Sequence, residues 1–237
     1  LDERDDNSHM YAQRIDPYGN ILWEENGRRI SMKESYQNDL GMIEDGTGGA
    51  FIIWHDGSIE NNGVFAQRID GNGNFLWRDT SVSICTAAGS QNDPVVVSDR
   101  EGGIIVTWED RRSGVYDIYA QRVDPDGNML WEDNGTIVCD AVGTQREHQT
   151  VPDGQGGAVI TWEDRRAGNV DIYTQRIDGS GDAYWAEDGV AICEYIGSQT
   201  DPELVGDGSG GAVISWVDYR NGNRDIFSQR IDATGDV

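Results

Sequence analysis

The chain has 237 residues, a formal net charge of −25 at pH 7 and an isoelectric point of about 4.2. Such a negative field repels nucleic acid and anionic membrane surfaces, so we expect neither as a partner. No run of eighteen apolar residues occurs in the sequence, and we therefore expect no membrane insertion.

A repeat of 54 residues runs through the sequence. The tetrapeptide Gln-Arg-Ile/Val-Asp begins at positions 13, 67, 121, 175 and 229, and the eight tryptophans follow the same spacing in two sets. A strict period of this length indicates one supersecondary unit stacked on its neighbours, because a single unit cannot bury its own apolar surface. We expect a single repeat domain over 1–237, with units at about 1–45, 46–99, 100–153, 154–207 and 208–237, the first and last being partial.

The unit that begins near residue 154 predicts strands only. Residues 156–162 are apolar and β-branched, 171–178 alternate between polar and apolar side chains, and a glycine-rich turn at 179–181 leads to short apolar segments at 183–185 and 190–193. Four short antiparallel strands per repeat of this length are typical of a β-propeller blade. We therefore predict an all-β fold, a β-propeller of four-stranded antiparallel blades of which the chain covers about four.

The number of blades is left open, because both ends of the sequence fall inside a unit. A closed ring of four blades would have one strand too many. Either the extra strand is displaced or donated to another chain, or the sequence is a piece of a larger propeller, which we favour. An open ring would leave unpaired strand edges, which invite self-association unless they are covered.

Two segments carry the pattern of the repeat most clearly. Trp108–Gly114 reads W-E-D-R-R-S-G, and Asp117–Asp124 reads D-I-Y-A-Q-R-V-D. This pattern resembles the repeats of large secreted or surface-anchored bacterial proteins. The resemblance implies β-propeller modules and an extracellular location, either secreted or attached to the cell surface. The first unit departs from the pattern, because no arginine follows Trp54-His55-Asp56-Gly57 in its loop.

Each unit repeats an aspartate two residues after a tryptophan and an arginine on the Gln-Arg-Ile/Val-Asp strand. An arginine between apolar neighbours needs a partner, because an unpaired buried charge is costly. We therefore predict a structural lock between these aspartates and arginines. The residues are Asp56, Asp110, Asp164, Asp218, Arg68, Arg122, Arg176 and Arg230.

Three turns carry carboxylate and amide oxygens at alternate positions, as a calcium loop would. The position that would hold a bidentate glutamate is Ser81, Gly135 or Gly189, and hairpin chemistry alone accounts for Asp, Asn and Gly in such turns. We predict turns without a cofactor, with calcium binding as the alternative. The calcium candidates are Asp70, Asn72, Asp124, Asp126, Asp178 and Asp182.

Another polar set lies where each unit enters its innermost strand. In a propeller these entrances surround one mouth of the central channel, where amides and carboxylates could hold a cation or bind a sugar or a basic peptide group. The alternative is that they cap the starts of strands. The candidate ligand-binding residues are Gln37, Asp39, Gln91, Asp93, Gln145, Glu147, Gln199 and Asp201.

A catalytic centre should appear as a break in the repeat, and such breaks are few. His148 stands where two other units have Pro94 and Pro202, beside Glu147, and the sequence has no His-Glu-x-x-His, P-loop or Gly-x-Ser-x-Gly motif. We therefore predict no catalytic residues and no enzyme, but an extracellular module that binds a carbohydrate or protein ligand. One alternative is a structural unit of a filament or surface layer that assembles through strand pairing. Another is a glycoside hydrolase or lyase with a carboxylate acid/base pair.

Overall fold

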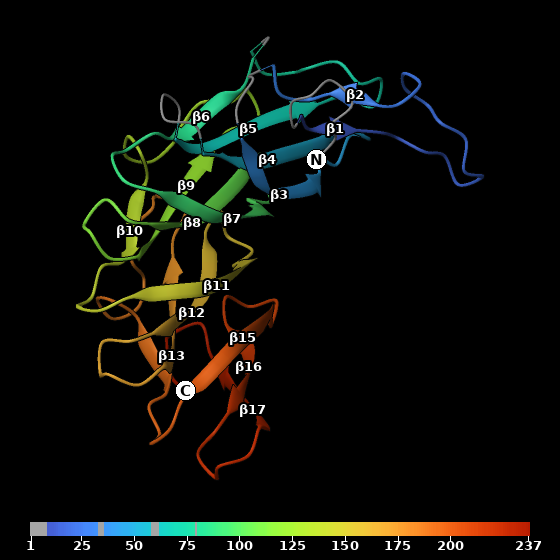
Figure 1. Cartoon of the computed structure of the whole chain (residues 1–237). Coiled ribbons are helices and arrows are strands. Elements are labelled where there is room, and N and C mark those ends of the chain that lie inside the picture. The colour runs from blue at the N-terminus through green and yellow to red at the C-terminus, as the bar shows by residue number, and fades with distance from the viewer. Residues whose placement is uncertain (1–8, 33–35, 58–61, 79) are drawn as a thin grey trace.

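The computed structural model describes residues 9–32, 36–57, 62–78 and 80–237. These residues form seventeen strands, and each strand in a sheet pairs antiparallel with its neighbour in sequence. The sheets follow one another along an arc whose two ends are apart (Figure 1). The fold is therefore all-β and propeller-like, and the described sheets form no closed ring. Among the described residues, no helix is long and apolar enough to cross a membrane.

Most of the described residues lie in meandering sheets that repeat along the chain. The first has β3 (Gln37–Glu44), β4 (Ala50–Asp56), β5 (Gly63–Ile69) and β6 (Val82–Cys85), the second β7 (Gln91–Ser98), β8 (Ile104–Asp110), β9 (Asp117–Val123) and β10 (Thr136–Cys139), and the third β11 (Gln145–Pro152), β12 (Ala158–Asp164), β13 (Asp171–Ile177) and β14 (Val190–Cys193). A three-stranded sheet follows, with β15 (Gln199–Gly206), β16 (Ala212–Asp218) and β17 (Asp225–Ile231). Near the N-terminus, β1 (Tyr11–Ala12) pairs with β2 (Arg28–Arg29).

The first strand of each sheet lies on the inner side of the arc. β3, β7, β11 and β15 contact one another in turn, whereas β6 and β10 lie on the outer side (Figure 1). The core fills the spaces between adjacent sheets, where Ile53 of one sheet meets Val96 and Trp108 of the next. Both faces of β8 and β12 are buried, and the first five residues of each strand are apolar except for one threonine, Thr107 or Thr161.

A repeated pair of donors ties each unit to the next. Arg122 Nη1 and Trp131 Nε1 both donate to the carbonyl oxygen of Gly179, each at 3.1 Å. The two donors lie in one unit and the acceptor in the next, so the contact fixes the spacing of neighbouring sheets. The same arrangement joins Arg14 and Trp23 to Gly71, Arg68 and Trp77 to Pro125, and Arg176 and Trp185 to Ala233.

The aspartates and arginines that we predicted to lock each unit have other partners. Asp110 accepts hydrogen bonds from Trp108 Nε1 at 2.8 Å and from Arg112 Nη2 at 2.6 Å. Arg122 instead donates to Asp99 Oδ2 at 3.0 Å. The predicted pair is too far apart because Arg122 is in register with Ile105, at the opposite end of β8 from Asp110.

The same exchange of partners recurs along the chain. Asp164 pairs with Arg166 and Asp218 with Arg220, while Arg68, Arg176 and Arg230 pair with Asp45, Asp153 and Asp207. Asp56, in the corresponding place of the first sheet, is fully buried and in register with Gln37. The prediction that these aspartates and arginines pair with one another is therefore wrong, and Arg230 is largely exposed.

Candidate functional site

Each innermost strand carries a bulge near its start. On β7, Asn92 is in register with Glu109 and Val95 with Thr107, so Asp93 and Pro94 together lie opposite Trp108. Asp93 has a φ of 49°, a left-handed conformation that costs an L-residue roughly 1–2 kcal/mol. A bulge redirects a side chain away from the regular sheet. The same conformation recurs at Asp39, Glu147 and Asp201, with φ values of 50°, 52° and 55°.

Three of these carboxylates meet at one hollow. Asp39, Asp93 and Glu147 come from three adjacent sheets and line a space of about 300 Å³, together with Glu109 and His148. Asp201 holds the equivalent position on β15 but lies outside this lining, 3.6 Å from Arg224 Nη2. The arc thus brings together three of the four carboxylates that the repeat places on the innermost strands. The sequence repeat does not reveal which three they are.

The four glutamines predicted for the same mouth are buried beneath it. Gln145 Nε2 donates to the Ala141 carbonyl at 3.2 Å, and Gln199 Nε2 donates to the carbonyls of Tyr195 and Gly197. Gln91 reaches Asp110 Oδ1 at 3.5 Å, and Gln37 donates to Ser31 Oγ. The glutamine side chains are therefore bonded inside the protein, near the starts of the innermost strands. The carboxylates, in contrast, face the hollow.

Glu109 is a functional candidate that sequence reasoning did not single out. Its side chain is almost fully buried, and its two oxygens accept hydrogen bonds from the main-chain N–H of Glu147 at 2.7 Å and from Arg146 Nε at 2.8 Å. Burial raises the pKa of Glu109, although these two donors oppose the shift. Glu163 holds the N–H of Asp201 in the same way at 3.0 Å. The signal in the sequence was the repeated glutamate after the tryptophan of this strand.

The electrostatics of the hollow favour a proton on Asp93. Burial raises the pKa of Asp93, and repulsion from the carboxylates of Asp39 and Glu147 raises it further. Arg146 opposes this shift, with its Nη2 3.9 Å from Asp93 Oδ2. A partly exposed carboxyl with a raised pKa beside other carboxylates is suited to acid/base chemistry.

The two histidines near the hollow are held by hydrogen bonds. His148 Nε2 lies 3.0 Å from Thr107 Oγ1, and burial lowers the pKa of His148 to about 4. His148 is almost fully buried and bonded to Thr107, which leaves its ring poorly placed to act together with the adjacent Glu147. His55 Nδ1 lies 2.8 Å from Asn38 Oδ1 and 3.7 Å from Asp39 Oδ2.

The residues that we considered for calcium binding form hydrogen bonds within their own turns. Asp124 Oδ1 accepts hydrogen bonds from the main-chain N–H groups of Asp126 at 2.9 Å and Asn128 at 2.8 Å. Asp70 and Asp178 bind the N–H groups of Asn72 and Asp182 in their turns in the same manner. Within the described ranges, no group of three or more His, Cys, Asp or Glu side chains is arranged to hold a metal ion.

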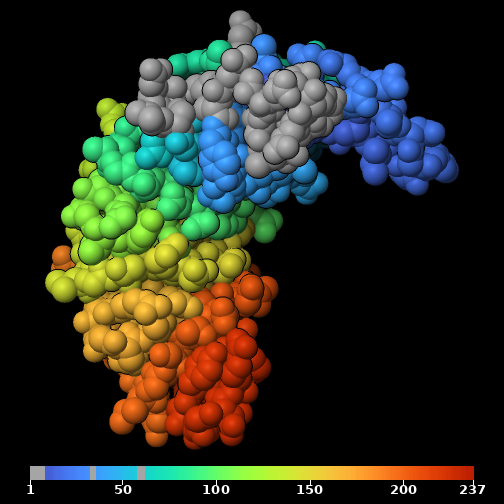
Figure 2. Space-filling model, viewed as in Figure 1, coloured from blue at the N-terminus to red at the C-terminus, as the bar shows by residue number. Residues whose placement is uncertain are grey.

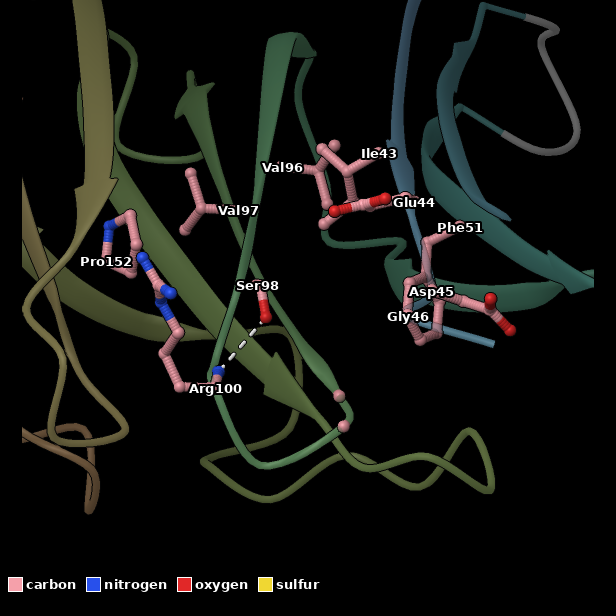
Figure 3. Close-up of a pocket in the computed structure, with 12 residues that line it drawn as sticks. Ile43, Glu44, Asp45, Gly46, Phe51, Val96, Val97, Ser98, Arg100 and Pro152 are labelled. Atoms are coloured by element: carbon pink, nitrogen blue, oxygen red, sulfur yellow. Dashed lines mark hydrogen bonds between the residues drawn. The ribbon is translucent and has the colours of Figure 1, made fainter. Parts of the chain in front are cut away.

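A second hollow, of about 540 Å³, lies at the other end of the innermost strands (Figure 3). Two carboxylates line it, Glu44 and Asp45, and Asp45 pairs with Arg68 at 3.0 Å. Arg100 has a φ of 65° where the neighbouring units have glycine, and it lies beside Pro152. Hydrogen bonds lower the pKa of Asp45, whereas burial raises the pKa of Asp93, so the hollow at Asp93 is the stronger candidate for catalysis.

No family model and no curated protein sequence matches this chain. It is similar to the solved structure of an endo-arabinase from Bacteroides thetaiotaomicron, with 14% identity over 81% of this chain and 74% of that one and a TM-score of 0.44. A second similar structure is an endo-1,4-β-xylanase from the same organism, with 10% identity, coverage of 85% and 70%, and a TM-score of 0.48. A third is an exo-β-1,3-galactanase from Clostridium thermocellum, with 14% identity and a TM-score of 0.49, over 94% of this chain and 49% of that one.

These solved structures are enzymes that act on carbohydrates, which contradicts our expectation of a non-enzymatic module. That expectation is corrected here. The sequence reasoning failed because it took a carboxylate repeated in every unit to be structural. The arc places Asp39, Asp93 and Glu147 around one hollow and leaves Asp201 outside, so repeated residues acquire different surroundings.

Proposed function

We propose that the protein is a carbohydrate-active enzyme, a glycoside hydrolase whose reaction centre is the hollow at Asp93. The observation that carries the proposal is the meeting of Asp39, Asp93 and Glu147 from three sheets around one space. Hydrolysis of a glycosidic bond requires two carboxyl groups, one that gives a proton to the leaving oxygen and one that activates water or attacks the sugar.

Asp93 is the proposed general acid. Burial and the neighbouring carboxylates raise its pKa, so it keeps its proton to a higher pH than an isolated aspartate. Glu147 is the proposed base or nucleophile, because its side chain is exposed at the hollow on the adjacent sheet. Arg146 lies between Glu109 and Asp93 and positions both, at 2.8 Å and 3.9 Å.

The fold that we propose for this activity is a β-propeller, with each sheet a blade and the hollow at one mouth of its channel. The bulges of β3, β7 and β11 support this, since they turn one carboxylate per blade toward the same axis. The chain would then cover about four blades. An extracellular location fits a polymeric carbohydrate substrate and the repeat pattern of secreted bacterial proteins.

The test is hydrolysis of polysaccharides by the full chain. Arabinan, β-1,4-xylan and β-1,3-galactan, the polymers of the similar structures, would be incubated with the protein and the release of reducing ends measured. We expect Asp93→Asn and Glu147→Gln each to lower kcat by about 100-fold or more. The alkaline limb of the pH profile should report the raised pKa of Asp93, because activity falls as Asp93 loses its proton.

Asp201→Asn is the matched control. Asp201 shares the bulge and the left-handed backbone of Asp93 but does not line the hollow, so this variant should keep full activity. Release of sugar that is unchanged in Asp93→Asn would refute the assignment of the acid. A folded wild-type protein that cleaves none of a broad set of glycans would refute the proposed activity.

A further inference from the structure

One interface between two sheets carries side chains that the repeat does not have elsewhere. It lies between the sheet of β7–β10 and the sheet of β11–β14, which pack against each other in the middle of the arc (Figure 2). Tyr116, directly before β9, and Arg146 on β11 differ from the residues at the same positions of the other units. Those residues are Asn62, Val170 and Arg224 for the first position, and Asn38, Asn92 and Thr200 for the second.

The Tyr116 ring carries the guanidinium of Arg146. The Arg146 Cζ lies 4.6 Å from the ring centroid, within the range of a cation–π contact. A second guanidinium, that of Arg111, lies 5.6 Å from the same centroid. The tyrosine is fixed at both ends, because its Oη accepts a hydrogen bond from Asn92 Nδ2 at 3.1 Å and its carbonyl oxygen accepts one from the Gln145 N–H at 2.8 Å. The ring therefore gives a long, flexible side chain a defined place.

The next interface along the chain is built without this pair. Val170 stands in the place of Tyr116, and its carbonyl oxygen also accepts a main-chain N–H from the next sheet, at 2.8 Å. Thr200 stands in the place of Arg146, and its hydroxyl bonds to the adjacent Asp201 at 3.1 Å. Two sheets can thus be joined by the same backbone contact without the tyrosine or the arginine, which points to a role other than packing.

The guanidinium that Tyr116 carries lies beside two carboxyl groups of the hollow. Arg146 Nε donates to Glu109 Oε2 at 2.8 Å, and Arg146 Nη2 lies 3.9 Å from Asp93 Oδ2. Both carboxyl groups line the hollow. The Arg146 side chain is 40% exposed, so burial alone does not hold it there. A planar guanidinium reaches two separate carboxyl groups only in a defined orientation, and the ring supplies that orientation.

Asp93 lies among groups that are mostly negative. The charged and titratable groups around it are Asp39 on β3, His55 on β4, Glu109 on β8, and Arg146 and Glu147 on β11. Burial raises the pKa of Asp93, and the carboxylates of Asp39 and Glu147 raise it further, whereas Arg146 lowers it. Arginine is the permanent cation of this set. The place of its guanidinium therefore affects how tightly Asp93 holds a proton.

We propose that Tyr116 is a positioning residue, which holds the Arg146 guanidinium against Asp93 and Glu109 and so keeps a cation at the edge of the carboxylate hollow. Tyr116 acts through Arg146 and does not itself touch the reacting atoms. This role rests on the proposed function in one respect, because it takes Asp93 to be the acid. The contact between ring and guanidinium is open to test whether or not a sugar is hydrolysed.

The first test is an NMR titration of the full chain, labelled in its aspartate carboxyl carbons, with the Asp93 signal identified by its absence in Asp93→Asn. Tyr116→Val introduces the residue that the repeat has at position 170, so the variant should fold. We expect a higher pKa of Asp93 in Tyr116→Val, because the guanidinium is released, and the same change in Arg146→Thr. Tyr116→Phe keeps the ring and should keep the pKa of the wild type.

Tyr184→Leu is the matched control. Tyr184 follows β13 and carries the guanidinium of Arg176, whose Cζ lies 4.4 Å from its ring centroid. This pair lies at the end of the sheet away from the hollow, since Arg176 is in register with Val159 near the start of β12, and Leu130 stands in the place of Tyr184 one unit earlier. The control should leave the pKa of Asp93 unchanged. An unchanged pKa in Tyr116→Val, or an equal rise in Tyr184→Leu, would overturn the proposal.

The second test is hydrolysis of a polymer that the wild type cleaves. Tyr116→Val should lower kcat by about 10-fold with little change in KM, because Asp93 and its neighbours lose their alignment in the transition state. The alkaline limb of the pH profile should move upward in the same variant, and Tyr116→Phe should restore both. A full kcat in Tyr116→Val would refute the positioning role and leave the hydrolase in place. A wild type that cleaves no glycan would refute the hydrolase, and the titration would still decide whether Tyr116 holds Arg146.

Discussion

Glu109 Oε1 accepts a hydrogen bond of 2.7 Å from the main-chain N–H of Glu147. The acceptor is on β8, and the donor is on β11 of the next sheet. The sheet of β8 therefore fixes Glu147, whose left-handed backbone presents its carboxylate to the hollow. Glu163 and Asp201 repeat the contact at 3.0 Å. His55 and Val217 take the place of the glutamate in the first and last sheets. The repeat therefore allows this hydrogen bond between neighbouring sheets, but the bond is not present in every unit.

Glu109→Gln should raise the free energy of unfolding at neutral pH, because burial of the ionised carboxylate costs more than the hydrogen bonds from Arg146 and from the N–H of Glu147 offset, as the raised pKa of Glu109 indicates. Urea unfolding would measure this gain. Glu163→Gln is the comparison and should gain stability for the same reason, because burial also raises the pKa of Glu163. A loss of stability in Glu109→Gln would contradict this prediction.

The same variant should change the pH dependence of stability. The pKa of Glu109 is raised by burial above its ordinary value of 4.5, so its contribution is present below that pH and is lost as the pH rises through the folded pKa. Glu109→Gln should remove this part of the slope. An identical slope in both proteins would show that Glu109 is not the group responsible.

His148→Pro should make the protein more resistant to acid. Pro94 and Pro202 occupy this position in other units, so the backbone accepts proline there. The pKa of His148 is lowered from 6.5 to about 4 by burial, so the unfolded chain takes up a proton first and stability falls as the pH drops between these values. The loss amounts to about 3 kcal/mol for the wild type and should vanish in the variant. Thermal melts at pH 7 and pH 4 would measure it, and equal losses in both proteins would contradict the assignment.

Arg166→Ala should destabilise the fold by about 3–5 kcal/mol. Asp164 is fully buried and would lose the partner that donates from Nη2 at 2.7 Å, keeping only the Trp162 indole N–H and the main-chain N–H at position 166. Arg165→Ala is the adjacent control. Its side chain is largely exposed, and we expect a loss below about 1 kcal/mol. Similar melting temperatures for the two variants would refute the importance of this pair.

Arg100→Gly should raise stability by about 1 kcal/mol, because glycine adopts a positive φ without the steric cost that arginine bears. Glycine stands at the equivalent positions 46, 154 and 208. Gly154→Ala is the reverse experiment. A Cβ there meets no atom within 4 Å, so any loss of stability reports the backbone conformation itself. Calorimetry would compare both, and a loss in Arg100→Gly would indicate a stabilising role for the side chain.

The period of 54 residues was enough to predict strands, their antiparallel order and their stacking. Pairing between side chains was not predictable from the period alone. Asp110 and Arg122 looked like natural partners, but the register of β8 with β9 puts them at opposite ends of the sheet, and Arg112 reaches Asp110 from two residues away. The register of two paired strands depends on the residues at which the hairpin between them turns. The repeat does not reveal those residues, because every unit turns at the same place.

Part of the candidate site could be predicted from the sequence. Asp39, Asp93 and Glu147 were identified as residues of the mouth. Gln91, predicted beside them, is buried against Asp110, and Glu109, which was not predicted, lines the hollow. The bulge explains the difference. By adding one residue between Asn92 and Val95, it turns the carboxylate outward and leaves the glutamine in the sheet interior. A local extra residue of this kind leaves no mark in a pattern that repeats without gaps.

The tryptophans opposite the bulges give the molecule an optical property. Trp108 and Trp162 are fully buried, and each donates its indole N–H to an aspartate two residues later, at 2.8 Å and 2.9 Å. Each tryptophan lies in register with the bulge that carries Asp93 or Glu147, and its ring stacks on Tyr119 or Tyr173 of the next strand. A shift of either bulge should therefore alter the surroundings of an intrinsic fluorophore. The emission of two of the eight tryptophans is thus coupled through the sheet to events at Asp93 and Glu147.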